Sequence, residues 1–226
     1  MTKETETMLT PVIQNIVCTC NLGSTLYLPG VARNLQGSEY NPKRFSAVTY
    51  RLKYPKTTAL FFGSGKMVCT GAKNKNEARL AIIKYVQLME KRMSLQLHIY
   101  DFHVQNMVAS ANVGFPVSLE KICMHYGKES SYEPELFPGL IFRMDECPAV
   151  FLIFLSGRLV ITGAKCKEHI KAAFDSIVPI LLTCKAKQYE EESVTQIRST
   201  TIQKIIPESQ IDWSLIDITD DVFSNI

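Results

Sequence analysis

The sequence has no long hydrophobic run, since no stretch approaches the roughly 18 apolar residues of a membrane-spanning helix. Its N-terminal segment is polar and has no apolar region typical of a secretory signal. Seven cysteines are present, but they do not form paired C-x-x-C motifs. These absences argue against membrane insertion, a disulfide framework and structural zinc. They predict an intracellular protein with reduced, mostly buried thiols.

Signatures of catalysis are also lacking. No nucleophile motif and no repeated pair of carboxylates stands out. The four histidines do not have the spacing of metal ligands: His98, His103, His125 and His169. We therefore expect no enzymatic activity, no metal and no cofactor.

The composition is that of a globular protein, with 226 residues of which 46% are hydrophobic and 21% charged. The charge is unevenly distributed. Residues 187–226 contain eight acids and three bases, a net charge of −5, so the rest of the chain carries +8 against an overall +3. A basic body with an acidic tail favours a polyanion as the partner of the body.

The chain contains an internal repeat. Phe62–Lys73 returns as Phe154–Lys165, with eight of twelve positions identical and an offset of 92. Two further blocks return in the same order at offsets of 91 and 92: Gln14–Val17 as Gln105–Val108, and Tyr40–Phe45 as Tyr132–Phe137. The period exceeds that of solenoid repeats, which indicates two fused domain-sized units. We predict a polar segment at 1–9, repeats at 10–94 and 95–186, and an acidic tail at 187–226.

Each repeat has the same predicted order of elements: a strand, a short helix, several hairpin strands and a long helix. In the first repeat we expect strands over 13–20, 45–52, 57–62 and 66–70, and helices over 29–35 and 75–93. In the second we expect strands over 102–110, 140–144, 150–154 and 158–162, and helices over 118–124 and 168–182. This order predicts an α+β fold with a curved antiparallel sheet and helices on one face.

Alternation along one strand shows which residues face away from the helices. Thr58, Leu60 and Phe62 lie on one side, whereas Ala59 and Phe61 lie on the other. One face of the sheet must pack against the helices, and the apolar character of the other face predicts a binding partner. An approximately two-fold symmetric molecule suits a two-fold ligand such as duplex DNA.

Several of these segments strongly resemble the TATA-box-binding protein family: Glu39–Phe45, Ser64–Lys73, Gln105–Val108, Ser131–Ile141 and Leu152–Phe154. The resemblance covers residues 10–186 and implies a saddle of ten antiparallel strands with four helices on its convex back. The 40-residue tail and the scattered departures in the core favour a paralogue, a TBP-related factor of the insect type. The resemblance also implies a nuclear protein that nucleates transcription preinitiation complexes for RNA polymerase III, RNA polymerase II or both.

The resemblance assigns roles in minor-groove DNA binding to particular residues. Two phenylalanine pairs would kink the DNA: Phe45 with Phe62, and Phe137 with Phe154. Polar contacts near the dyad would come from Asn15, Asn106, Thr70 and Thr162. Apolar contacts would come from Val17, Val68, Val108, Val160, Leu60 and Leu152. Phosphate contacts would come from Arg51, Arg143, Lys66 and Arg158, although the last two could be ordinary solvated charges.

Protein partners are expected on two other surfaces. Glu133, Glu135 and Leu136 match the loop that holds transcription factor IIB, so the resemblance implies IIB or a Brf-type factor there. Arg79, Lys84 and Lys91 match the helix engaged by transcription factor IIA, and TBP-associated factors are also expected. A divergent scaffold with little TATA recognition is the alternative. The acidic tail could be mobile, which we favour, or could fold onto the DNA-binding face as a mimic of DNA.

Overall fold

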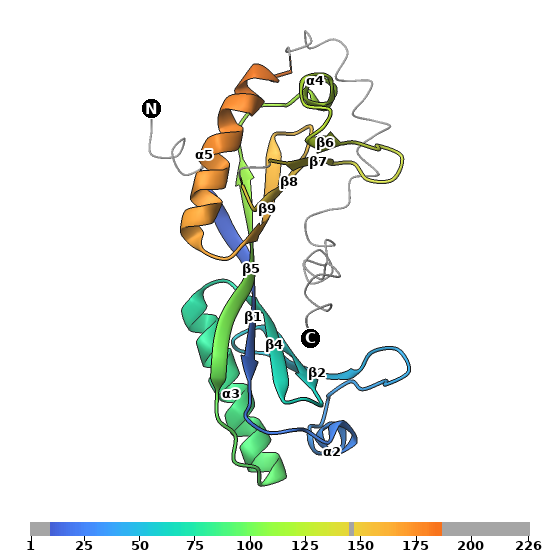
Figure 1. Ribbon diagram of the computed structural model, residues 1–226, viewed down its shortest axis with the longest axis vertical. Helices are drawn as coiled ribbons and strands as arrows, with labels where there is room; N and C mark the ends of the chain where they lie inside the picture. Colours follow the sequence, from blue (N-terminus) through green and yellow to red (C-terminus); the bar gives the residue numbers. More distant parts are fainter. Residues whose placement is uncertain (1–9, 145–146, 187–226) are drawn as a thin grey trace.

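The computed structural model describes residues 10–144 and 147–186. In this part of the chain nine strands form one antiparallel sheet in the order β2-β3-β4-β1-β5-β9-β8-β7-β6 (Figure 1). The strands are β1 (Val12–Asn21), β2 (Ala47–Leu52), β3 (Thr57–Phe62), β4 (Lys66–Ala72), β5 (Tyr100–Asn112), β6 (Ser130–Ser131), β7 (Leu140–Arg143), β8 (Val150–Ile153) and β9 (Arg158–Ala164). The helices are α2 (Leu28–Asn34), α3 (Lys75–Met93), α4 (Leu119–His125) and α5 (Lys167–Thr183).

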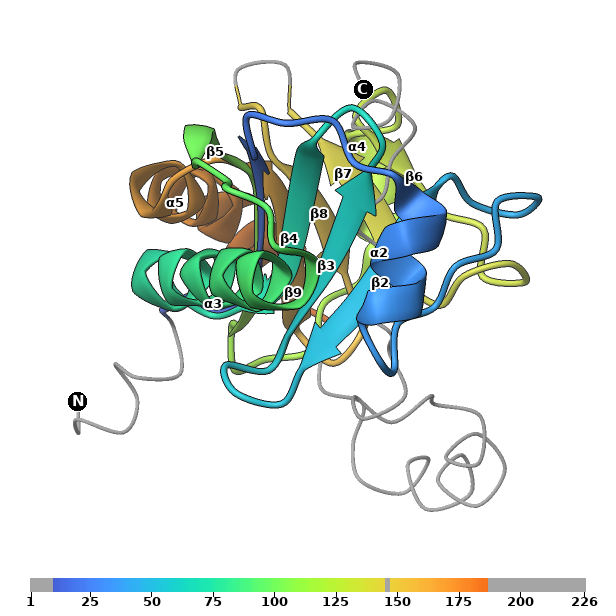
Figure 2. The ribbon, with the colours of Figure 1, turned by 90° about the horizontal axis from the view of Figure 1, so that it is seen from below.

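The two repeats have matching topology and meet in the middle of the sheet, where β1 pairs with β5. The long helices α3 and α5 lie on the same side of the sheet, and α2 and α4 lie at its two ends (Figures 1 and 2). The predicted α+β architecture, with the helices on one side, is confirmed. We call the opposite side of the sheet the front face, defined at its centre by Asn15, Val17, Asn106 and Val108.

Each repeat has its own hydrophobic core between the sheet and its long helix. In the first repeat Ala59 and Phe61 are fully buried in this core, together with Tyr85 of α3. Leu60 and Phe62 belong instead to a separate apolar cluster on the front face. The alternation predicted from the sequence is therefore confirmed, because successive side chains of one strand enter different clusters.

Local signals at both ends of α3 explain its length. The side chain of Asn74 accepts a hydrogen bond from Glu77 N at 2.8 Å, and Lys73 N donates to Glu77 Oε2 at 2.9 Å. The first bond satisfies an N–H group that the first helical turn leaves without a partner, and the second ties the residue before the N-cap to the helix. At the other end Ser94 adopts a left-handed conformation with φ 52°, which stops the helix. Between these two ends, the buried side chains of α3 run from Ala78 to Met89 and pack into the core of the first repeat.

The sheet differs from the ten strands expected. The described residues form nine, because the first-repeat counterpart of β6 is reduced to a single bridge between Glu39 and Thr49. The strand predicted over 45–52 begins at Ala47, so Phe45 lies in the preceding loop. Phe154 lies just beyond the end of β8. Each of these phenylalanines is held by a turn: Phe45 N donates to Asn41 O at 2.9 Å, and Phe154 N donates to Arg158 O at 3.0 Å.

The thiols agree with the expectation of buried, unpaired cysteines. All seven are free; Cys18, Cys20, Cys69 and Cys184 are buried and the others partly so. Burial raises the pKa of Cys20 to about 12. Across the described residues, no helix is long and apolar enough to cross a membrane and no cluster of potential metal ligands occurs. The expectations for residues 1–9 and for the tail 187–226 lie outside the described residues.

Candidate nucleic-acid interface

The centre of the front face is a two-fold arrangement of asparagine and valine. In the β1–β5 ladder Asn15 lies opposite Val108, and Val17 lies opposite Asn106. Because residues two apart on a strand share a face, all four side chains belong to the same side of the sheet. The sequence repeat therefore becomes a spatial dyad that passes between the two asparagines.

Hydrogen bonds fix the orientation of each asparagine amide. Gly71 N donates to Asn15 Oδ1 at 2.7 Å, and Gly163 N donates to Asn106 Oδ1 at 2.8 Å. Since a backbone N–H can only donate, the amide oxygen must face the glycine and the NH2 group must face the other way. Asn15 Nδ2 in turn donates to Thr70 Oγ1 at 3.1 Å.

The second repeat completes the pattern, because Asn106 Nδ2 donates to Thr162 Oγ1 at 3.0 Å. Asn15 and Asn106 are also well buried, with exposed fractions of 3% and 9%. Their neighbours therefore hold each amide in one orientation.

Two glycines that the sequence analysis did not assign to the site make this geometry possible. Gly71 has φ +101° and Gly163 has φ +92°, in a region that residues with side chains rarely adopt. A Cβ atom on Gly71 would lie 2.9 Å from Lys56 O, and one on Gly163 would lie 2.6 Å from Pro148 O. The sequence signal for both is the Thr-Gly-Ala-Lys block that recurs in the two repeats.

Apolar side chains surround the central asparagines in both repeats. In the first, Val17, Phe62 and Val68 form the front-face cluster with Ala47, and Phe45 and Leu60 pack against it. In the second repeat the matching valines, Val108 and Val160, are also buried, and Leu152 is half-buried. Apart from its central amides and threonines, the middle of the face is therefore apolar, as predicted.

The four phenylalanines assigned as wedges form two pairs, one in each repeat. The Phe45 and Phe62 rings have centroids 6.1 Å apart and planes at 74°, and the Phe137 and Phe154 rings are 6.0 Å apart at 62°. Both are edge-to-face contacts, a favoured arrangement for aromatic rings. Gly139 lies so close to the second pair that a Cβ atom there would be 2.7 Å from Phe137 Cε1.

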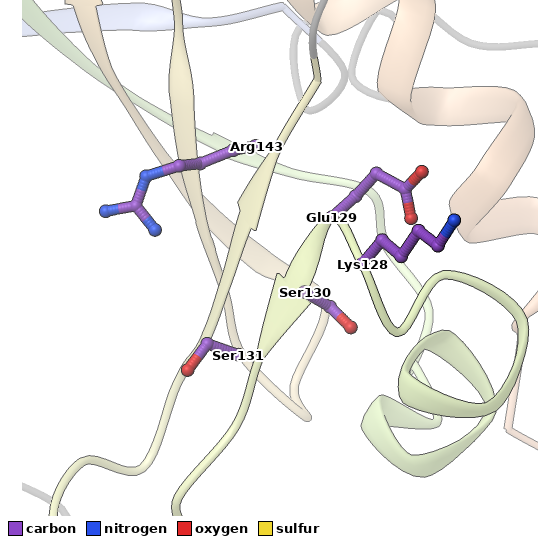
Figure 3. Close-up of a pocket in the computed structure, with 5 residues that line it drawn as sticks. All are labelled: Lys128, Glu129, Ser130, Ser131 and Arg143. Carbon is purple, nitrogen blue, oxygen red and sulfur yellow. The ribbon is translucent and has the colours of Figure 1, made fainter.

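The basic residues assigned to phosphate contacts differ in their surroundings. Arg51, Arg143 and Arg158 are exposed, whereas Lys66 is half-buried. Arg51 forms an ion pair of 2.6 Å with Glu39. Arg143 lines a shallow hollow of about 360 Å³ with Lys128, Glu129, Ser130 and Ser131 (Figure 3).

The loop assigned to transcription factor IIB is strongly exposed. Leu136 is 81% exposed, Glu133 and Glu135 are exposed, and the backbone turns by hydrogen bonds from Leu136 N and Phe137 N to Glu133 O. This loop and its first-repeat counterpart project away from α3 and α5 in the same direction (Figure 1). An exposed large apolar residue that directly follows two acids offers a contact for a protein partner.

The three basic residues expected on the exposed side of α3 differ in their surroundings. Arg79 and Lys91 are exposed, but Lys84 is half-buried. Its Nζ lies 5.0 Å from the centre of the Tyr54 ring and donates to Tyr54 O at 3.1 Å. The β2–β3 turn thus folds back onto the helix and binds the ammonium group through a cation–π contact, and the expected role of Lys84 in partner binding stays a prediction.

The fold and the front face together define a class: duplicated α+β proteins whose single antiparallel sheet has helices on one side and an apolar, pseudo-two-fold face on the other. The family model described as transcription factor TFIID, or TATA-binding protein, matches residues 10–92 and 101–184. The chain belongs to the TATA-binding protein family.

Known relatives agree with this assignment. The chain is 51% identical over 177 residues to the TATA-box-binding protein of Spodoptera frugiperda, covering 78% of this chain and 57% of that protein. It is 49% identical over 180 residues to TATA-box-binding protein 1 of Triticum aestivum, covering 80% of this chain and 77% of the relative. The solved structure of Methanococcus jannaschii TBP matches with a TM-score of 0.68 and 38% identity, over 76% of this chain and 98% of that one.

Proposed function

We propose that this protein is a transcription initiation factor that binds A/T-rich, TATA-like promoter DNA in the minor groove. Its front face would lie on the DNA, the two phenylalanine pairs would kink the duplex, and its other surfaces would recruit further factors. The single observation that carries this proposal is the two-fold front face, with oriented amides at its centre and an aromatic pair in each repeat.

The chemistry of this face suits the minor groove of A·T pairs. That groove presents the acceptors A N3 and T O2, while G·C pairs add the guanine amino group. The amide oxygens are held by Gly71 N and Gly163 N, and each NH2 group donates to a threonine; in the complex these NH2 groups would also donate to such acceptors. Apolar valines and leucines tolerate an A·T floor but would leave a guanine amino group without a partner.

Bending would follow from the aromatic pairs. Apolar side chains inserted between base steps unstack them at a cost of a few kcal/mol per step, which the gain in contact area offsets. TATA-binding protein is itself the known example of this mode, with a kink of about 80°. Flexible TA steps lower the cost, so DNA deformability contributes to the choice of site.

We further propose that the protein is a paralogue serving RNA polymerase III, RNA polymerase II or both. Its identity to TATA-box-binding proteins stays between 49% and 53% across Triticum aestivum, Bombyx mori and Caenorhabditis elegans, which suits a copy that diverged from all of them. It would act in the nucleus. The exposed loop at Glu133, Glu135 and Leu136 would bind transcription factor IIB or a Brf-type factor. The basic residues of α3 would bind transcription factor IIA or TBP-associated factors: Arg79, Lys84 and Lys91.

The test is binding and bending of a TATA duplex labelled at both ends for fluorescence transfer, against a G·C-scrambled duplex at fixed salt. The variants Phe62→Ala and Phe154→Ala each remove one ring of a pair. Leu182→Ala is the matched control, because it removes an exposed large apolar residue on the helix side of the sheet.

We expect selective binding with bending, bending lost in both phenylalanine variants, and no change in the control. Equal binding to both duplexes, or binding without bending, would refute the proposal. It would leave the alternative of a protein scaffold within a transcription complex.

A further inference from the structure

The two arginines assigned to phosphate contacts hold equivalent positions but have different neighbours. Arg51 and Arg143 are 92 residues apart. Each follows, by two positions, a residue that is paired with the chain segment at the outer edge of its half of the sheet. In the first repeat that partner is Glu39, opposite Thr49. In the second it is Ser131, opposite Ile141. The same diagonal contact across the two chain segments is therefore available in both repeats.

Only the first repeat fills this diagonal with opposite charges. Arg51 Nη1 lies 2.6 Å from Glu39 Oε1, with side chains that are 59% and 68% exposed. Ser131 carries no charge, so the second repeat cannot form the same pair. Figure 3 shows the Arg143 guanidinium pointing away from the carboxylate of Glu129. Within residues 10–144 and 147–186, no ion pair of Arg143 is found.

We propose that Glu39 makes the two halves of the DNA-binding face unequal, so that Arg143 contributes more than Arg51 to the binding of DNA phosphates. This inference rests on the proposed minor-groove binding. Arg51 must exchange a carboxylate for a phosphate, and the carboxylate left behind is a negative charge beside the DNA. Among the described residues, Arg143 has no carboxylate to leave in this way. Glu39 is thus a residue that tunes affinity although it carries the same sign of charge as the ligand.

Salt dependence measures this difference directly. Each phosphate neutralised by a protein cation contributes about 0.9 to the slope of log K against log salt for duplex DNA. Between 50 and 200 mM salt, one such contact corresponds to a factor of about 3.5 in affinity. An arginine that leaves a carboxylate to bind a phosphate produces little net release of ions, so its contribution to the slope is small.

The experiment measures TATA-duplex affinity between 50 and 200 mM salt for Arg51→Ala, Arg143→Ala, Glu39→Gln and the double variant Glu39→Gln/Arg51→Ala. We expect Arg143→Ala to reduce the slope by about 0.9, and Arg51→Ala to change it much less. Glu39→Gln should steepen the slope by about 0.9 and tighten binding at low salt. In the Glu39→Gln background, Arg51→Ala should cost as much as Arg143→Ala.

Two controls separate this effect from net charge. Asp175→Asn removes one exposed negative charge on α5, on the far side of the sheet, and should leave the slope nearly unchanged. Ser131→Glu supplies the missing acid and should lower the contribution of Arg143. If wild-type protein selects TATA DNA but Arg51→Ala and Arg143→Ala reduce the slope equally, the inference fails and the proposed function stands. If wild-type protein does not select TATA DNA, the proposed function itself fails.

Discussion

Replacing Gly139 by alanine tests whether the second phenylalanine pair must keep its geometry. The added Cβ atom would lie 2.7 Å from Phe137 Cε1 and 3.0 Å from Phe154 Cε1. Both rings must therefore retreat by roughly 0.5 to 1 Å to reach ordinary carbon–carbon contact. Holding side chains this far from their preferred rotamers costs about 0.5–1.5 kcal/mol. That cost corresponds to about a 2- to 12-fold loss of affinity for bent DNA.

Folding should be affected much less than binding. Phe137 is 37% exposed and lies on a loop, so its ring can turn away in the free protein. We expect the free energy of unfolding to change by less than about 1 kcal/mol. Denaturant unfolding and fluorescence-transfer bending of a TATA duplex give the two readouts.

The control is Gly63→Ala, beside the first pair, where the new Cβ atom would meet only Leu26 O at 3.7 Å. Wild-type binding and bending by Gly139→Ala would refute the idea that this pair is a shaped wedge. A loss of the same size in Gly63→Ala would show that the effect does not arise from the ring contacts.

Three further predictions concern single residues. Asn15→Asp keeps the acceptor for Gly71 N but removes the NH2 donors, so TATA affinity in a titration should fall by about 1–3 kcal/mol. Because the carboxylate is buried and the bond to Thr70 is lost, thermal stability should fall as well. Gly71→Ala places a side chain at φ +101° and against Lys56 O, so urea unfolding should show a loss of about 1–3 kcal/mol. Burial raises the pKa of Cys20 to about 12, so the folded state keeps this proton when the unfolded state loses it. The free energy of unfolding should therefore fall as pH rises from about 9 to 12, and less steeply in Cys20→Ala.

Most of the fold could be predicted because its signals are local. The period-two pattern of Ala59, Leu60, Phe61 and Phe62 is sufficient to assign each side chain to a face. The apolar spacing of residues 75–93 gives the long helix with the bounds that the structure has. The repeat then supplied the global symmetry, since equivalent elements of fused copies must be related by one rotation.

The remaining features depend on contacts between distant segments. The hydrogen bond from Gly71 to Asn15 arises where the β1–β4 register shifts between Ile16 and Cys18, and a shift of this kind has no signature in either strand alone. The position of Lys84 depends on the turn at Tyr54, thirty residues earlier. Sequence patterns predicted the residue types of the front face correctly, but could not predict the partners that orient them.

The internal repeat also indicates where the two halves have come to differ. Asn15 and Asn106 keep the same amide orientation, each held by the glycine of a Thr-Gly-Ala-Lys block, which is expected if both halves make the same contact across the dyad. Where a residue differs from its counterpart in the other repeat, the two halves cannot make the same contact at that position. Glu39 against Ser131 is such a position, and it changes the charge beside an arginine that is otherwise equivalent. The two halves of a duplicated binding face can therefore be compared directly: the second half shows the surroundings of the arginine when serine replaces the glutamate.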